Sequence, residues 1–129
     1  MAVDPDEDFL AAFLADEPDR PVVMLNLLRF AAGGRELYRQ YSTAFAETIA
    51  ERFGVEVLYA GDGREALVAE PGQQWDAVLL VAYPSRRVFA EMVADPQYAK
   101  ISPLRSQALS EAVLQPTQPW GRRSDPPSR

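Results

Sequence analysis

The sequence contains no cysteine and no histidine among its 129 residues. Without cysteine, neither a disulfide framework nor a thiolate nucleophile is available. Without histidine, the commonest general base, the commonest metal ligand and the usual switch near neutral pH are all missing. These absences exclude the common catalytic triads and disfavour a transition-metal site, so we expect no bound metal.

Positive charge and long apolar runs are also scarce. The chain has 13 basic and 19 acidic residues, a net charge of −6, and Lys100 is its only lysine. No basic stripe is present, so nucleic acid is not an expected partner. No apolar run approaches the roughly 20 residues of a membrane-spanning helix, and the first residues, MAVDPDEDF, are too acidic for a targeting peptide. We therefore expect a cytoplasmic protein that binds neither nucleic acid nor membranes.

The clearest pattern present is the stretch 75–98. Residues 77–82 form an apolar run, AVLLVA, of strand length. Pro84 has no N–H to continue a sheet, and Ser85 can accept hydrogen bonds from the first N–H groups of a helix. Apolar residues then recur at helical spacing, at Val88, Phe89, Met92 and Val93. The stretch predicts a strand, a corner and a helix that packs on the sheet.

Residues 22–30, VVMLNLLRF, predict a strand that is apolar on both faces and therefore central in its sheet. Asn26 interrupts this pattern. A buried amide costs roughly 1–3 kcal/mol unless it is hydrogen-bonded. Asn26 therefore either pairs with neighbouring backbone or points into a pocket, and the sequence does not decide between these alternatives.

The other elements follow from caps, turns and periodicity. Asp4-Pro5 predicts the start of a short N-terminal helix that packs as a lid on one end of the sheet. The rest of the chain predicts a long helix over 35–53 ended by Gly54, a strand over 55–60, a short strand or helical turn over 65–70, a turn or helix over 97–101, a helix from Ser102-Pro103 to Glu111, and a strand over 113–118. The Asp62-Gly63 pair favours a hairpin, and Pro116 favours an edge position for the last strand.

This order is an N-terminal helix followed by β–α–β–β–α–β, which predicts an α+β sandwich of four antiparallel strands with both long helices on one face. The length predicts one domain, over residues 20–118, with an N-terminal helical extension over 1–19 and a flexible tail over 119–129. The central strands are apolar on both faces, so the face without helices needs a cover. A second copy of the sheet is the simplest cover, which predicts a homodimer.

The chain resembles an uncharacterised bacterial family, known only as a domain of unknown function, in the dimeric α+β barrel superfamily. The resemblance covers about residues 20–118 and is carried by the Trp75-Asp76 pair, the Tyr-Pro-Ser corner at 83–85, the M-x-x-D-P-x-Y segment at 92–98, and Arg105. It implies a ferredoxin-like fold, a dimer, and a ligand cavity between the sheet and its helices. It implies no agreed activity.

The candidate site residues are polar and aromatic side chains at strand ends and on helix faces. We predict catalytic roles for Asn26, Asp76, Tyr98 and Arg105, and ligand contacts from Tyr41, Tyr59, Trp75, Tyr83 and Met92. The guanidinium of Arg105 can fork onto a carboxylate or phenolate, and Asp76 can act as a base if it is buried. The alternatives are a salt bridge from Arg105 to Asp76, Asp95 or Glu91, a capping role for Asp76, and ordinary core packing of the aromatic residues.

Three functions are compatible with this pattern. The first is a cofactor-free oxygenase, isomerase or cyclase acting on a small apolar or phenolic molecule, which is chemistry that relatives in the superfamily perform without metal or flavin. The second is a non-catalytic binder of such a molecule. The third is a dimeric structural module with a filled core. The first is the preferred hypothesis, because positioning and oxyanion stabilisation need neither histidine nor cysteine.

Overall fold

The computed structural model describes residues 2–120. Its helices are α1 (Glu7–Ala15), α2 (Gly34–Thr48), α3 (Ala50–Phe53), α4 (Arg86–Ala94) and α5 (Pro96–Ala108), and its strands are β1 (Val22–Phe30), β2 (Glu56–Asp62), β3 (Ala77–Tyr83) and β4 (Leu109–Thr117). The predicted tail lies outside the described residues from position 121 onward.

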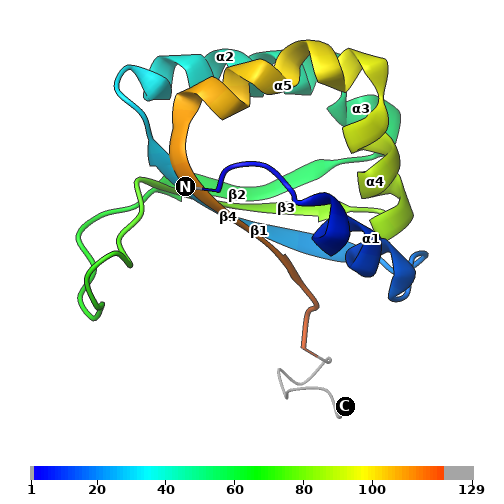
Figure 1. The fold of residues 1–129 in the computed structure, drawn as a ribbon, viewed down its shortest axis with the longest axis horizontal. Coiled ribbons are helices and arrows are strands. Elements are labelled where there is room, and N and C mark those ends of the chain that lie inside the picture. Colours follow the sequence, from blue (N-terminus) through cyan, green and yellow to red (C-terminus); the bar gives the residue numbers. More distant parts are fainter. Residues whose placement is uncertain (1, 121–129) are drawn as a thin grey trace.

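The four strands form one antiparallel sheet in the order β2-β3-β1-β4. The helices cover one face of this sheet and leave the other face open (Figure 1). This is the predicted α+β architecture, with β1 in the centre. Pro116 lies in β4, an edge strand, where its missing N–H removes no central hydrogen bond.

Strand β1 alternates between the two faces of the sheet. Val22, Met24, Asn26 and Leu28 are buried against the helices, whereas Val23, Leu25 and Leu27 are half-buried on the open face. The main core joins the helix-facing side of β1 and β3 to α2, α4 and α5. Because both faces of β1 are apolar, its hydrophobic pattern is continuous.

The helices differ from the prediction at two places. The predicted helix over 35–53 is interrupted at Ile49, whose φ of −120° separates α2 from α3, although Gly54 ends α3 with a φ of +66° as expected. The predicted helix start at Ser102 is wrong. Asp95 caps a single helix instead, by accepting a hydrogen bond from the Gln97 N–H at 2.9 Å, and Pro103 lies inside that helix. The helix also ends earlier than predicted, because β4 begins at Leu109.

The segments next to the sheet also differ from the prediction. The N-cap of α1 is Asp6 rather than Asp4, because the Asp6 carboxylate accepts hydrogen bonds from the N–H groups of Asp8 and Phe9. Residues 65–70 form neither strand nor helix but part of a long connection between β2 and β3. The hairpin predicted at Asp62-Gly63 is therefore wrong: Asp62 ends β2, and the antiparallel partner of β2 is β3, more than ten residues further along the chain.

Within residues 2–120, every helix is too short or too polar to cross a membrane.

Candidate functional site

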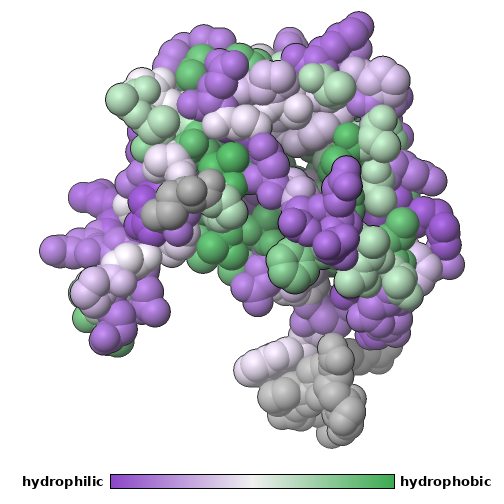
Figure 2. Space-filling view, in the orientation of Figure 1, coloured by the Kyte–Doolittle hydropathy of each residue, from purple (hydrophilic) through white to green (hydrophobic). Residues whose placement is uncertain are grey.

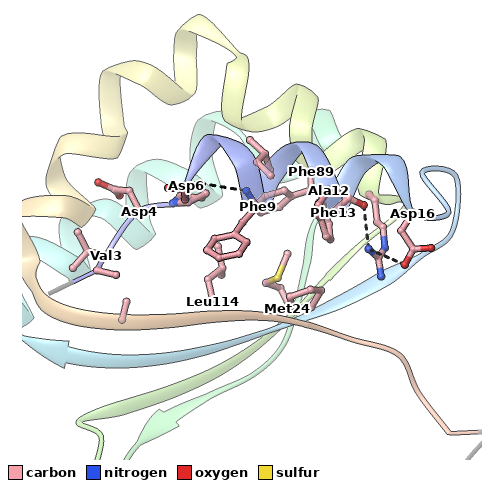
Figure 3. A pocket seen from close by; sticks show the side chains of 16 residues that line it. Val3, Asp4, Asp6, Phe9, Ala12, Phe13, Asp16, Met24, Phe89 and Leu114 are labelled. Atoms are coloured by element: carbon pink, nitrogen blue, oxygen red, sulfur yellow. Dashed lines mark hydrogen bonds and ion pairs between the residues drawn. The ribbon is translucent and has the colours of Figure 1, made fainter.

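A cleft of about 710 Å³ lies on the helix-bearing side of the sheet, beside β4. Its floor includes Met24 of β1 and Leu114 of β4, and its walls include Phe9 and Phe13 of α1 and Phe89 of α4 (Figure 3). Phe9 is 79% exposed although it lines the cleft. The volume lies within the range of about 300–1,000 Å³ that is usual for small-molecule sites.

The N-terminal segment crosses the mouth of this cleft. We call residues 2–6, which all line the cleft, the strap. The Ala112 N–H donates to the Ala2 carbonyl at 2.9 Å, which joins the strap to β4. Figure 2 shows hydrophobic residues gathered between the helical layer and the sheet on the face that the strap crosses, with hydrophilic residues around them. The strap therefore covers an apolar interior.

Four tyrosines and one arginine form a mostly buried cluster between the helices and the sheet. We call them the tyrosine–arginine cluster: Tyr38 and Tyr41 of α2, Tyr83 of β3, and Tyr98 and Arg105 of α5. The hydroxyls of Tyr41 and Tyr98 are 3.0 Å apart and share a hydrogen bond. Tyr98 and Arg105 lie seven residues apart, which is two turns along the same face of α5. The packing of α2 on α5 therefore assembles the cluster.

The buried phenols are held in their neutral form. Burial raises the pKa of Tyr38 to about 12, against a smaller lowering by the charge of Arg105. Burial also raises the pKa of Tyr41 and of Tyr83 well above the ordinary tyrosine value, and the neighbouring Tyr98 adds to both shifts. At neutral pH these hydroxyls are hydrogen-bond donors or acceptors and not bases.

Arg105 supplies the positive charge of the cluster and is only 6% exposed. Its Nη1 donates to the carbonyl of Val3 and lies 3.5 Å from a carboxylate oxygen of Asp4. Its Nη2 is buried and has no hydrogen-bond partner among the described residues. A buried guanidinium nitrogen without a partner is costly, so it marks a position at which an additional acceptor would be stabilised.

The structure brings together some of the predicted site residues. Tyr41, Tyr98 and Arg105 belong to the cluster, as does Tyr83. Met92 is 2% exposed and belongs to the same core. Asn26 faces the helices from the middle of β1, and its amide donates to the Met24 carbonyl at 3.3 Å. Its hydrogen bond is thus the backbone pairing that was one of the two alternatives.

Three predicted site residues lie elsewhere. Asp76 is exposed and accepts a hydrogen bond from the Phe30 N–H at 2.9 Å, so it lacks the burial required of a base. Trp75 stacks under the guanidinium of Arg29, 4.1 Å from its ring centre. Tyr59 is 56% exposed on the edge strand β2. The predicted salt-bridge partners of Arg105 are also wrong, since Asp95 pairs with Arg52 and the carboxylate near Arg105 is Asp4.

Sequence reasoning missed several residues of this region. Tyr38 could have been identified from the sequence, because it lies three residues before the predicted site residue Tyr41 and therefore on the same helix face. Asp4 was assigned to a helix cap, which concealed its contact with Arg105. A second cleft, of about 630 Å³, opens between α2 and the β2 side of the sheet and is lined by Tyr38, whereas the first cleft reaches the cluster only through Val3 and Asp4, which contact Arg105. In residues 2–120 no three carboxylates converge as metal ligands.

The comparisons with known proteins agree with the fold. A family model described as Domain of unknown function (DUF1330) matches residues 27–115. A crystal structure of a protein of unknown function from Rhodopseudomonas palustris is 29% identical, with a TM-score of 0.82 over 92% of this chain and 97% of that chain. No curated protein matches the sequence.

Two more distant structures share the fold. A hydroxynitrile lyase from Passiflora edulis is 12% identical, with a TM-score of 0.59 over 78% of this chain and 94% of that one. A dimeric protein of unknown function with a ferredoxin-like fold from Bacteroides fragilis is 10% identical, with a TM-score of 0.54 over 76% of this chain and 95% of that one. These two likenesses concern the fold alone.

Proposed function

The chain belongs to the DUF1330 family of domains of unknown function, and from the site itself we propose a cofactor-free enzyme that acts on a small apolar or phenolic molecule. The observation that carries this proposal is the buried Arg105, whose Nη2 has no hydrogen-bond partner within residues 2–120 and which lies among tyrosines near a ligand-sized cleft. Oxygenase, isomerase and cyclase reactions that proceed through an enolate or a phenolate place negative charge on an oxygen of the substrate.

The chemistry that the cluster offers is oxyanion stabilisation. The guanidinium of Arg105 can donate to a developing enolate or phenolate, and so can one of the hydroxyls of Tyr41 and Tyr98, namely the one that accepts the hydrogen bond they share. Such preorganised donors act most strongly where the dielectric constant is low. The carboxylate nearest to Arg105 in this structure is that of Asp4, 3.5 Å from Nη1.

A second candidate function is non-catalytic binding of the same kind of molecule. The raised pKa of Tyr38 and Tyr41 favours this alternative, because neutral phenols fix a ligand without accepting a proton from it. Binding and catalysis make the same demands on the cluster up to the chemical step. They differ in whether a product forms.

Titration with naphthol and with its methyl ether tests the proposal, followed by mass spectrometry of the mixture with and without oxygen. We expect naphthol to bind more tightly than the ether and to be converted, because only naphthol can form the stabilised phenolate. Tyr98→Phe should weaken naphthol binding, whereas Lys100→Gln, an exposed change on the same helix, should not. Binding without product would select the second function. Equal binding of naphthol and ether, or none, would contradict both and leave the structural module.

The proposal includes a homodimer in which the open sheet faces pack together. Supporting this, the open face carries half-buried Leu25, Leu27 and Leu80, and a distant structure with the same fold is described as dimeric. Exposed apolar surface of this kind is typical of an interface. Because the two copies are identical, a two-fold axis brings the same face of each sheet into contact and makes the contact self-complementary.

A further inference from the structure

A carboxylate already occupies the neighbourhood of Arg105, and it comes from the strap. Asp4 places one oxygen 3.5 Å from Nη1 of Arg105, and the hydroxyl of Ser106 lies 3.1 Å from each of its two oxygens. Arg105 and Ser106 are consecutive residues of α5, so one helix supplies both donors. Together with the buried guanidinium, these contacts form a built subsite for a carboxylate.

Asp4 fills this subsite incompletely. Its carboxylate approaches only Nη1, while Nη2 is buried and has no partner in the described part of the chain. A guanidinium binds a carboxylate best through two parallel hydrogen bonds, which uses both nitrogens. The Asp4 side chain is also 57% exposed, and exposed ion pairs contribute little to stability. A free carboxylate with better geometry can therefore compete with Asp4.

The cleft next to this subsite is suited to an apolar tail. Val3 and Asp4 contact Arg105 and also line the cleft, so moving the strap exposes the guanidinium to the cleft. Beyond the strap, the lining is mainly apolar, with Phe9, Met24 and Leu114 facing the space (Figure 3). An apolar molecule with one carboxylate matches an anion subsite at one end of an apolar cleft.

We propose that the natural ligand is an apolar monocarboxylate whose carboxylate replaces Asp4 on Arg105 and Ser106, so that the strap is an internal competitor for its own site. This inference rests on the proposed function, because it assigns the ligand class of the same site. It adds the anion subsite, the role of Asp4, and movement of the strap on binding.

Calorimetric titration with octanoate and octanol tests the inference on the full chain and on Asp4→Asn and Asp8→Asn. Octanoate should bind the unaltered protein about tenfold more tightly than octanol, as expected for charge-assisted hydrogen bonds. Asp4→Asn removes the competing charge and should tighten octanoate binding severalfold while leaving octanol unchanged. Asp8→Asn makes the same charge change on α1 outside the cleft, so it should leave both affinities unchanged.

Hydrogen exchange gives an independent measure of strap movement. The amide of Ala112 donates to the Ala2 carbonyl, so its protection should fall when octanoate binds and remain when octanol binds. The inference is overturned if Asp4→Asn raises the affinity for octanol as much as that for octanoate, or if Asp8→Asn raises the octanoate affinity as much as Asp4→Asn does. It is also overturned if the Ala112 amide stays protected when octanoate binds. If octanoate fails in this way while naphthol binds through Tyr98, the proposed function stands without the inference. If octanoate behaves as expected and naphthol does not bind, the carboxylate subsite stands and the phenolic chemistry falls.

Discussion

The buried tyrosines determine how single residues respond to pH. A phenol that ionises inside the protein creates a buried negative charge, which is unfavourable. The positive charge of Arg105 offsets this cost only in part. The folded state therefore holds the proton of Tyr38 more tightly than the unfolded chain does. The hydroxyl of Tyr41 shares the same surroundings and is tied to Tyr98.

This difference predicts that stability falls at alkaline pH. The pKa of Tyr38 rises from its ordinary value of 10.0 to about 12 on folding, so its contribution is fully present below pH 10 and is lost as the pH rises through 12. The free energy of unfolding, measured by urea denaturation from pH 8 to 11, should decline above pH 10. Tyr38→Phe should make the decline shallower. An equal decline in Tyr38→Phe would show that Tyr38 is not responsible.

At the scale of elements, the close contact between the start of α2 and the end of α5 positions the cluster. Gly34, the first residue of α2, lies against Ala108, the last residue of α5, and a Cβ atom at position 34 would overlap the Ala108 carbonyl. That carbonyl also accepts a hydrogen bond from the Ala31 N–H at 2.8 Å. The two helices can approach this closely only because residue 34 has no side chain.

Gly34→Ala should therefore destabilise the fold, although alanine is the better helix former. Backbone atoms cannot move aside as a flexible side chain can, so we expect a loss of at least about 2 kcal/mol in the free energy of unfolding. The exposed Ala46 of α2 provides the comparison, because Ala46→Gly should lose only about 1 kcal/mol from helix propensity. Urea denaturation of both variants measures the difference. A Gly34→Ala protein more stable than the original would contradict the proposed close contact.

At the scale of the whole molecule, the open sheet face is the proposed contact between two copies of the chain. Leu80 of β3 pairs with Leu25 of β1 and with Tyr59 of β2, so it lies in the middle of that face. The face is continuous from β2 across to β4, with the Arg29–Glu111 ion pair on its border. An apolar centre with a charged border resembles the interior and rim of a protein interface.

Leu80→Glu should convert the proposed homodimer into a folded monomer, because packing two sheets together would bury two unpaired carboxylates. Light scattering coupled to size-exclusion chromatography measures the mass, and circular dichroism verifies that the fold is kept. Ala99→Glu, an exposed change on α5, provides the control and should remain dimeric. A monomeric unaltered protein would refute the sheet-to-sheet dimer.

The sequence by itself determined the elements that depend on local patterns. The central position of β1 follows from its apolar residues on both faces, the edge position of β4 from Pro116, and the end of α3 from Gly54. Each of these signals lies within the element itself or next to it. Hydrophobic periodicity, a missing N–H and a positive φ are properties of neighbouring residues, so they can be recognised without a partner.

The tertiary structure alone decided which polar groups meet. Asp4 contacts Arg105 across 101 residues of sequence, and Tyr41 shares a hydrogen bond with Tyr98 across 57. Packing also decided that Asp95 and not Ser102 caps α5, and that Asp76 lies at an exposed position. Judged by residue type and charge alone, several acidic residues could have formed the ion pair with Arg105. Only the course of the strap over the cleft selects Asp4, because the energy of such a pair depends on distance and burial, which no local pattern encodes.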